Sequence, residues 1–316
     1  MIPKNKTAVI FGGTGFIGRQ VVRELAEMGL QIKIATRVPE RAYFLRPQGN
    51  VGQIVPIACD YSEEAISNIV SGCDYVVNTI GILFEKSKNG FQKTHVQIPK
   101  MIATAASQHK VKSFVHVSAL ACERGTSKYA HTKLAGEQEI LQACPSATIL
   151  RPSVVFGEDD SFFNMFAEMS CYLPFLPLIG GGKTKFEPVY VGDVADAVIY
   201  ALKNASTKGH IYELCGPDQV SFKEIYEILR EETNRKSALI PLPMPLAKVQ
   251  AFFMQFLPNP PLTPDQVESL KTDNVKNPDS LGLSDMEINP TAMKLILPDY
   301  LERYRPGGRF AYQKTA

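Results

Sequence analysis

The chain of 316 residues carries 34 basic and 32 acidic residues, which gives a net charge of +2. This near balance excludes a nucleic-acid-binding protein that depends on a strong overall positive charge. Hydrophobic residues make up 45% and charged residues 21%, a composition that excludes disorder over most of the chain and allows a large core.

The first half of the chain alternates short apolar runs with amphipathic runs. These patterns predict strands at residues 7–11, 31–36, 51–58, 74–80, 113–117 and 147–150, and helices at 16–28, 63–70, 94–108 and 128–142. Strands separated by helices of this length form β-α-β units, whose right-handed crossovers build a parallel sheet with helices on both faces. The predicted fold class is therefore α/β, a Rossmann-type doubly wound parallel sheet.

The pattern changes after residue 156, where prolines become frequent. A strand and a helix are expected within residues 189–202, and another strand at 210–214. A further helix begins near Ser221, whose hydroxyl can form a capping box with Glu224.

Two regions follow from this change. We predict an NAD(P)-binding Rossmann domain at residues 1–155 and a smaller substrate or partner region at 156–316. The second region is interleaved with the first, because the strands near 189 and 211 are expected to return to the main sheet.

A glycine-rich turn connects the first predicted strand to the first helix. Gly12 permits a tight turn, Gly15 lets the backbone approach a pyrophosphate, and Gly18 lets the helix pack close to the strand. The phosphate would meet the unpaired N–H groups and the positive dipole end of the helix. A purely structural turn is the alternative, but the place in the first β-α-β unit favours dinucleotide binding. The residues expected at the phosphates are Gly12, Thr14, Gly15, Phe16, Ile17, Gly18 and Arg19.

The residue at the end of the second strand indicates whether the dinucleotide is NAD(H) or NADP(H). An acidic residue about 20 residues past the glycine loop would hold the ribose 2′-hydroxyl of NAD. Arg37 stands there instead, with Arg41 one turn later, and a guanidinium pairs with a 2′-phosphate. We therefore expect NADP(H) in preference to NAD(H), with Arg19 also in reach. NAD(H) is the alternative if Arg37 is only a solvated surface side chain.

The ends of the next two strands complete the predicted dinucleotide site. Ligands of such sheets bind at the carboxyl ends of the strands. Asp60 and Tyr61 would therefore lie near the adenine, and Thr79, Ile80 and Gly81 near the ribose.

A Tyr-x-x-x-Lys pattern, Tyr129 and Lys133, opens the helix after the fifth strand. Positions four apart share a helix face, so the ammonium can lower the pKa of the phenol and bond the nicotinamide ribose. A tyrosinate near neutral pH is a competent acid and base for hydride chemistry at a carbonyl. Ser118 is a weaker third catalytic candidate, because the four residues after it carry no hydroxyl. Thr126 and Ser127 are its alternatives.

Together these motifs resemble the short-chain dehydrogenase/reductase superfamily. The resemblance rests on the glycine loop, the strand that ends at Ser118, the Tyr-x-x-x-Lys helix and residues 151–157. It points to the extended and atypical branches, which include epimerases, dehydratases and reductases. It implies dinucleotide contacts at Val117, Ser118, Tyr129, Lys133, Pro152, Ser153, Val154 and Val155.

A narrower resemblance covers most of the chain. Residues 50–53, 78–81, 127–129, 188–194 and 241–243 are similar to the large nucleotide-binding accessory subunits of respiratory complex I, the NADH:ubiquinone oxidoreductase. This resemblance implies a tightly held NADPH and a structural, accessory or assembly role. It also implies membrane-associated respiratory subunits as partners.

Two other functions stay open. An active NADPH-dependent reductase, or an epimerase or dehydratase, would act on an apolar carbonyl or quinone-related substrate, with Tyr129 as acid and base. A redox-sensing regulator would instead report dinucleotide occupancy to a protein partner. Whether the chain is an enzyme depends on the third catalytic group, for which Ser118 is the candidate.

Three segments of the second half bear on partners. Residues 172–179 are apolar for a loop, and either cover the core or form a pocket or surface for a quinone-like or lipid molecule or for a partner subunit. Residues 246–257 form an apolar helix with Lys248 as its one charge, which packs in the core, lies in a membrane interface or docks on a membrane complex. The basic tail at 303–309 is a flexible end or a contact to an anionic membrane.

Membrane insertion, export and metal binding are not expected. No apolar run approaches the ~18 residues of a membrane-spanning helix, and no h-region or transit sequence precedes the first strand. We expect a cytoplasmic bacterial protein, peripheral on the inner face of the cytoplasmic membrane if it meets a membrane. The six cysteines form no C-x-x-C pair and the five histidines share no metal-site spacing, so free thiols and no metal are expected.

Overall fold

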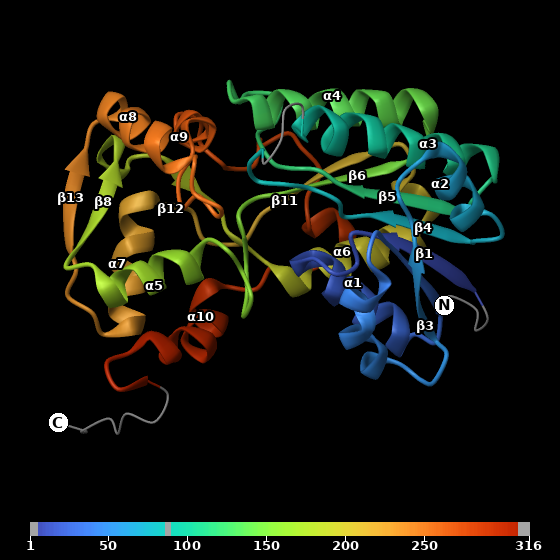
Figure 1. The fold of residues 1–316 in the computed structure, drawn as a ribbon, viewed down its shortest axis with the longest axis horizontal. Helices are drawn as coiled ribbons and strands as arrows, with labels where there is room; N and C mark the ends of the chain where they lie inside the picture. The colour runs from blue at the N-terminus through green and yellow to red at the C-terminus, as the bar shows by residue number, and fades with distance from the viewer. Residues whose placement is uncertain (1–5, 86–89, 309–316) are drawn as a thin grey trace.

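A computed structural model gives the structure of residues 6–85 and 90–308. Its centre is a seven-stranded parallel sheet with the strand order β11-β6-β5-β4-β1-β2-β3 (Figure 1). The strands are β1 (Thr7–Phe11), β2 (Gln31–Thr36), β3 (Ile54–Ala58), β4 (Tyr75–Asn78), β5 (Ser113–Val117), β6 (Thr148–Pro152) and β11 (Ile211–Leu214). The order reverses at β1 and β4, which is the doubly wound topology, so the predicted α/β Rossmann-type fold is confirmed.

Helices cover both faces of the sheet. α1 (Phe16–Glu27) and α6 (Val191–Lys203) pack together on one face, and α2 (Glu63–Val70), α3 (Ile98–Gln108) and α4 (Lys128–Ala143) cover the other (Figure 1). Each layer closes its own apolar core. Neighbouring residues of β1 point into different cores, because side chains alternate along a strand.

Two first-half segments differ from the predicted pattern. The helix expected at 94–108 begins with a π-helical turn, η2 (Gln92–Gln97), ahead of α3. The backbone of the helix at 128–143 packs against this turn so closely that a Cβ on Gly136 would lie 1.9 Å from the carbonyl oxygen of His95. The 3₁₀ helix η1 (Pro39–Gln48) was not predicted, because its few apolar residues follow no helical repeat.

The second region lies beside the sheet and has its own aromatic core (Figure 1). Its helices, together with the remaining short 3₁₀ turns of the chain, are α5 (Phe163–Tyr172), α7 (Phe222–Thr233), α8 (Met244–Met254), α9 (Pro264–Ser269), α10 (Met293–Leu301), η3 (Gly180–Gly182), η4 (Ala205–Thr207), η5 (Ser284–Met286) and η6 (Glu302–Tyr304). Three two-stranded sheets pair β7 (Val155–Phe156) with β10 (Val189–Tyr190), β9 (Lys185–Phe186) with β12 (Val220–Ser221), and β8 (Phe175–Ile179) with β13 (Ala238–Leu242). The predicted capping box at the start of α7 is present.

Three expectations about this region need correction. Residues 172–179 are not a loop, because their second part is strand β8, which pairs with β13. The strand near 211 does join the main sheet as β11, but the strand near 189 is the two-residue β10, which pairs with β7 instead and is followed directly by α6. The segment that contains the tail arginines is not a flexible end. Arg303 donates to the Glu158 carbonyl and Arg305 to the Glu232 carbonyl, each at 2.7 Å. Residue 309 lies outside the described residues.

Helix lengths also bear on membrane contact. Within residues 6–85 and 90–308, no helix is both long and apolar enough to traverse a bilayer. The apolar helix predicted at 246–257 is observed as α8 and the turn after it.

Candidate functional site

The glycine turn between β1 and α1 holds two positions that a larger residue cannot occupy. Gly12 has a φ of +83°, and a Cβ there would lie 2.7 Å from the Thr79 hydroxyl oxygen. A Cβ on Gly18 would lie 2.2 Å from the carbonyl oxygen of Gly12. Gly12 therefore lies close both to the residues that follow β4 and to the first turn of α1, as the first glycine of a dinucleotide-binding turn does.

The amino end of α1 has no capping side chain. Gly15 is the N-cap, no side chain accepts a hydrogen bond from the first turn, and this turn contains no acidic residue. The Gly15 N–H donates to the Gly12 carbonyl at 2.9 Å, and the half-buried Thr14, Phe16 and Ile17 flank it. The remaining N–H groups of the first turn are the donors that a pyrophosphate would need.

The three arginines predicted at the 2′-phosphate lie in different environments. Arg37 and Arg41 are exposed beyond β2. Arg37 and Asp60 line one surface hollow of about 520 Å³ at the ends of β2 and β3. Arg19 instead donates from Nη1 to Oδ2 of Asp159 at 2.7 Å. The structure thus brings Arg37 to the predicted adenosine end and gives Arg19 a carboxylate partner.

The residues predicted after β3 and β4 lie at the same edge of the sheet. Asp60 accepts hydrogen bonds from the backbone and the hydroxyl of Ser62, which lower the pKa of its carboxyl. Tyr61 is partly buried and donates to a carbonyl of β2 at 3.5 Å. The Thr79 hydroxyl donates to the Phe11 carbonyl at 3.0 Å and so ties β4 to β1. These contacts fix the edge along which the adenosine would lie.

Tyr129 and Lys133 share one face of α4, as predicted. Lys133 is buried, and its Nζ lies 6.0 Å from the centre of the Tyr129 ring and donates to the Val117 carbonyl at 3.4 Å. A Cβ on Gly81 would lie 3.3 Å from this nitrogen. Lys133 therefore reaches the ends of β4 and β5, where the nicotinamide ribose was predicted.

The electrostatics of the pair differ from the prediction. Burial lowers the pKa of Lys133 to about 8. Burial, and to a smaller extent the Cys122 thiol, raise the pKa of the Tyr129 phenol above its usual value. The expected lowering of the phenol pKa by the ammonium is therefore wrong for this structure, because burial dominates the pKa of the phenol and the ammonium lies 6.0 Å from the ring centre.

An aromatic pair that the sequence did not reveal holds the Tyr129 ring. Phe91 and the buried His95 both contact it edge-on, with ring centres 6.0 and 5.3 Å away. Nε2 of His95 accepts the Ile82 N–H, so Nδ1 is assigned the proton and donates to the Thr132 hydroxyl at 3.0 Å. Burial lowers the pKa of His95 to about 3, which keeps the ring neutral. The π-helical turn that places it has no recognisable sequence pattern.

A second buried polar pair lies at the ends of β4 and β5. Asn78 accepts the Ile80 N–H at 3.0 Å and pairs through Nδ2 with Nδ1 of His116, also at 3.0 Å. Burial lowers the pKa of His116 well below its ordinary value, so this nitrogen is a neutral acceptor. Asn78 thereby fixes the backbone of Ile80, a predicted cofactor residue. The sequence did carry a signal for this pair, because Asn78 is a polar residue at the end of an otherwise apolar strand.

Of the three hydroxyl groups considered for catalysis, two form hydrogen bonds within the described part of the protein and one does not. Ser118 is 5% exposed, and its Oγ has no hydrogen-bond partner within the part of the chain that the structure describes. Ser127 accepts the Ala130 N–H as the N-cap of α4, and Thr126 donates to Glu268 at 2.9 Å. Ser118 is therefore the one of these three whose hydroxyl has no hydrogen-bond partner within the described residues.

A segment of the second region, residues 263–277, contacts the amino end of α4 and the residues that follow β6. Asp265 accepts the backbone N–H groups of Lys128 and Tyr129 at 2.7 and 3.0 Å. Asn274 accepts the Ser153 hydroxyl at 2.7 Å and the Val154 N–H at 3.1 Å.

These bonds change the roles open to two predicted cofactor residues. The Ser153 hydroxyl and the Val154 N–H have intrachain acceptors, so they are not positioned as free donors to a dinucleotide. Of their predicted neighbours, Pro152 ends β6 and Val155 begins β7. Buried Val117 ends β5 beside Ser118.

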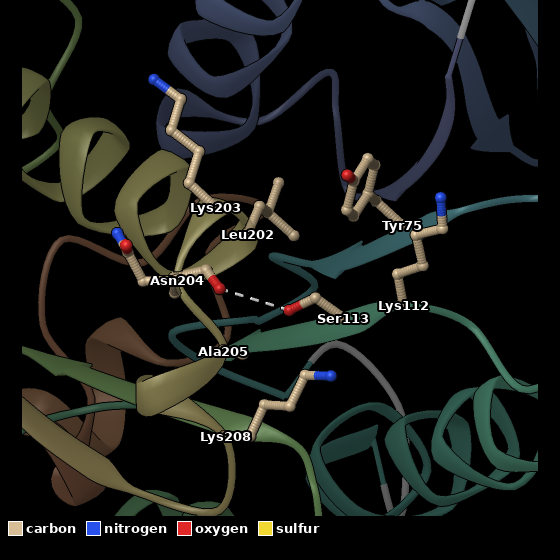
Figure 2. A pocket seen from close by; sticks show the side chains of 9 residues that line it. Tyr75, Lys112, Ser113, Leu202, Lys203, Asn204, Ala205 and Lys208 are labelled. Atoms are coloured by element: carbon tan, nitrogen blue, oxygen red, sulfur yellow. Dashed lines mark hydrogen bonds between the residues drawn. The ribbon is translucent and has the colours of Figure 1, made fainter. Parts of the chain in front are cut away.

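A second hollow lies at the opposite edge of the sheet. This space of about 310 Å³ lies between the last turn of α6 and the amino ends of β4 and β5. Lys112, Lys203 and Lys208 are among the residues that line it (Figure 2). Inside it, the Ser113 hydroxyl donates to the Ala201 carbonyl at 3.3 Å. It is formed where α6 packs on β5, far from the glycine turn along the strands.

Comparison with known families agrees with this geometry. Residues 8–215 match the family described as "NAD dependent epimerase/dehydratase family". The chain belongs to the NAD dependent epimerase/dehydratase family. A nicotinamide dinucleotide fits the observed residues, since the glycine cradle excludes any Cβ, the helix end is uncapped and the buried Ser118 hydroxyl lacks a partner.

Within this family, close relatives cover nearly the whole chain. It is 35% identical over 315 residues to NADH dehydrogenase [ubiquinone] 1 alpha subcomplex subunit 9 of Arabidopsis thaliana, covering 95% of this chain and 78% of the relative. The mouse protein of the same name is 34% identical, with 94% and 80% covered. The predicted resemblance to complex I accessory subunits is therefore confirmed.

Solved structures share the fold at lower identity. An NADPH-dependent quinone oxidoreductase of Escherichia coli, solved with NADPH, superposes with a TM-score of 0.73 at 19% identity over 93% of this chain and 98% of that one. At such identity the likeness carries the family fold only.

Proposed function

We propose that this chain is an NADP(H)-stabilised accessory subunit, or an assembly protein, of a respiratory complex I. The observation that carries the proposal is the 34–35% identity with relatives named as subunits of the NADH dehydrogenase alpha subcomplex, over almost the full chain. The site supports a binding role, since the uncapped end of α1 and the unpartnered Ser118 hydroxyl offer hydrogen bonds to a dinucleotide.

The dinucleotide would be held by residues of the first region. The glycine turn would take the pyrophosphate at the end of α1, and Arg37 and Arg41 would pair with the 2′-phosphate of NADP(H). Lys133 and Ser118 would bond the nicotinamide ribose. A nicotinamide dinucleotide supplies hydride transfer when a substrate is present, and in the accessory role its binding stabilises the native state by mass action.

Three features argue against efficient turnover. The phenol of Tyr129 has a raised pKa, so little tyrosinate forms near neutral pH. Thr126 and Ser127 are bonded elsewhere, which leaves Ser118 as the one candidate to polarise a carbonyl. Residues 263–277 are anchored beside Tyr129 by Asp265 and Asn274, where a substrate would enter.

The division of labour follows the two predicted regions. Residues 1–155 would hold the dinucleotide, and residues 156–316 would contact the subunits of the complex. The chain would then lie at the inner face of the cytoplasmic membrane, attached through that complex.

A co-isolation experiment tests the accessory role. The tagged chain is isolated from detergent-solubilised membranes of the cells that make it, and NADH:quinone activity in the isolate is measured. We expect the activity to accompany the wild type and Tyr129→Phe alike, because no turnover is required.

The contrasting variant is Gly15→Val, whose side chain would occupy the pyrophosphate position. It should lose both the dinucleotide and the co-isolated activity. Loss of the activity in Tyr129→Phe with the dinucleotide retained would contradict the accessory role.

A further inference from the structure

Helix α8 packs on the protein through small residues and directs its large apolar residues to solvent. Ala247 and Ala251 are fully buried against the second region. Six large side chains of α8 and the turn after it, here called the α8 face, are each more than half exposed: Leu246, Val249, Phe252, Phe253, Phe256 and Leu257. A helix that buries alanine and exposes phenylalanine inverts the usual pattern, so its outer face is built for an apolar environment.

These six positions form one continuous stripe. At about 100° per residue they cover an arc of about 140° on the side opposite Ala247 and Ala251. Lys248 and Gln255 border one side of the arc, and Gln250 borders the other. The rings of Phe253 and Phe256 each meet Phe252 edge-on, at 5.6 and 5.7 Å between ring centres. The face therefore has the apolar width and polar borders of a helix that lies flat in an interface.

The charges around the α8 face are positive. Residues 243–259, which include α8 and the turn after it, contain Lys248 but no aspartate or glutamate. Exposed Lys183 follows η3, which packs against the first residue of α8. Lys248 lies 2.5 Å from a Glu268 oxygen, and this carboxylate also pairs with Lys271. The excess of positive charge complements an anionic surface and not a cationic one.

We propose that the α8 face binds the surface of an anionic lipid membrane. Helix α8 has 11 residues, which corresponds to ~16 Å of helix, so it would lie along the headgroup boundary with its phenylalanines inserted. The inference goes beyond the proposed function, because it places a lipid contact on this chain itself and does not depend on the dinucleotide or on complex I.

Vesicle binding by the purified full chain tests the proposal. Flotation is compared between vesicles of phosphatidylcholine with phosphatidylglycerol and vesicles of phosphatidylcholine alone. The wild type should bind the anionic vesicles, and the triple variant Phe252→Ser, Phe253→Ser, Phe256→Ser should bind them about a hundredfold less tightly. The variant Lys183→Gln should lose about fivefold on anionic vesicles and little on neutral ones.

A matched triple variant controls for the removal of exposed apolar area in general. Val51, Leu83 and Leu295 are also more than half exposed but lie on other elements, and their replacement by serine should leave vesicle binding unchanged. All variants should retain the dinucleotide content of the wild type, which separates this test from that of the proposed function.

Two outcomes would overturn the proposal. The first is no binding to anionic vesicles, or binding that the phenylalanine triple variant retains. The second is a wild-type dimer in light scattering that this variant converts to a monomer while vesicles stay unbound, which would assign the α8 face to a second copy of the chain.

Discussion

Arg37 is the residue that we expect to distinguish NADP(H) from NAD(H). It is exposed at the end of β2 and shares a hollow with Asp60. Arg37→Glu should weaken NADPH binding about ten- to hundredfold in calorimetric titration, because it removes a charge-assisted bond and adds repulsion. NADH affinity should not fall. Arg46→Glu is the control, since Arg46 is exposed on the same segment and stacks on Tyr43; equal losses for both dinucleotides in Arg37→Glu would contradict the assignment.

Lys133 should make the free energy of unfolding of the dinucleotide-free protein depend on pH. Its pKa falls from 10.5 to about 8 on folding, which corresponds to about 3 kcal/mol. Between these values the unfolded chain binds more protons than the native one, so the free energy of unfolding rises with pH. The cost of the buried charge is fully present below pH ~8 and disappears towards pH ~10.5.

Urea unfolding from pH 7 to 10.5 checks this sign. Lys133→Met should lack the alkaline rise and be the more stable protein at pH 7, by up to about 3 kcal/mol. Lys128→Met, an exposed lysine on the same helix, should keep the wild-type profile. Parallel pH profiles for wild type and Lys133→Met would show that Lys133 is not desolvated.

At the scale of elements, a buried ion pair joins α4 to β6. Arg151 and Glu137 are 4% and 1% exposed, and their side chains form hydrogen bonds of 2.6 to 3.1 Å. Glu137→Gln leaves the guanidinium with only partial compensation from Glu123 and the more distant Glu213, and should cost about 3 kcal/mol or more of unfolding free energy. Glu139→Gln, which breaks only the outer pair with Lys100, should cost less than about 1 kcal/mol in the same denaturation experiment. Equal effects would refute a structural role for the buried pair.

The elements that could be predicted from the sequence are those determined by residues close together in the chain. The six strands predicted in the first half, the glycine turn and the capping box at Ser221 depend on residues close together in the chain, and they fold as expected. Strand β8 was missed because its partner β13 lies more than 50 residues away, and an apolar run with prolines shows no alternation on its own. The π-helical turn at His95 depends on the close approach of Gly136, which is likewise a tertiary contact.

At the scale of the whole molecule, the second region completes the site that the first region begins. Asp265 contacts Tyr129 across 136 residues of chain, and Asn274 contacts Ser153 across 121. Sequence motifs identified Tyr129 and Ser153 but could not show that residues 263–277 would bond them. Such contacts follow from how the two regions pack, and no motif within either region alone encodes them.

In the accessory role the dinucleotide is a fixed part of the protein and not a reactant. The most direct test denatures the protein as purified, identifies any released dinucleotide, and follows its redox state in the native protein with carbonyls and quinones added. We predict NADPH at near-unit occupancy, unchanged over hours. Oxidation of NADPH by one of these compounds would contradict the account and make the chain a reductase, and absence of any dinucleotide, even after its addition, would remove the site itself.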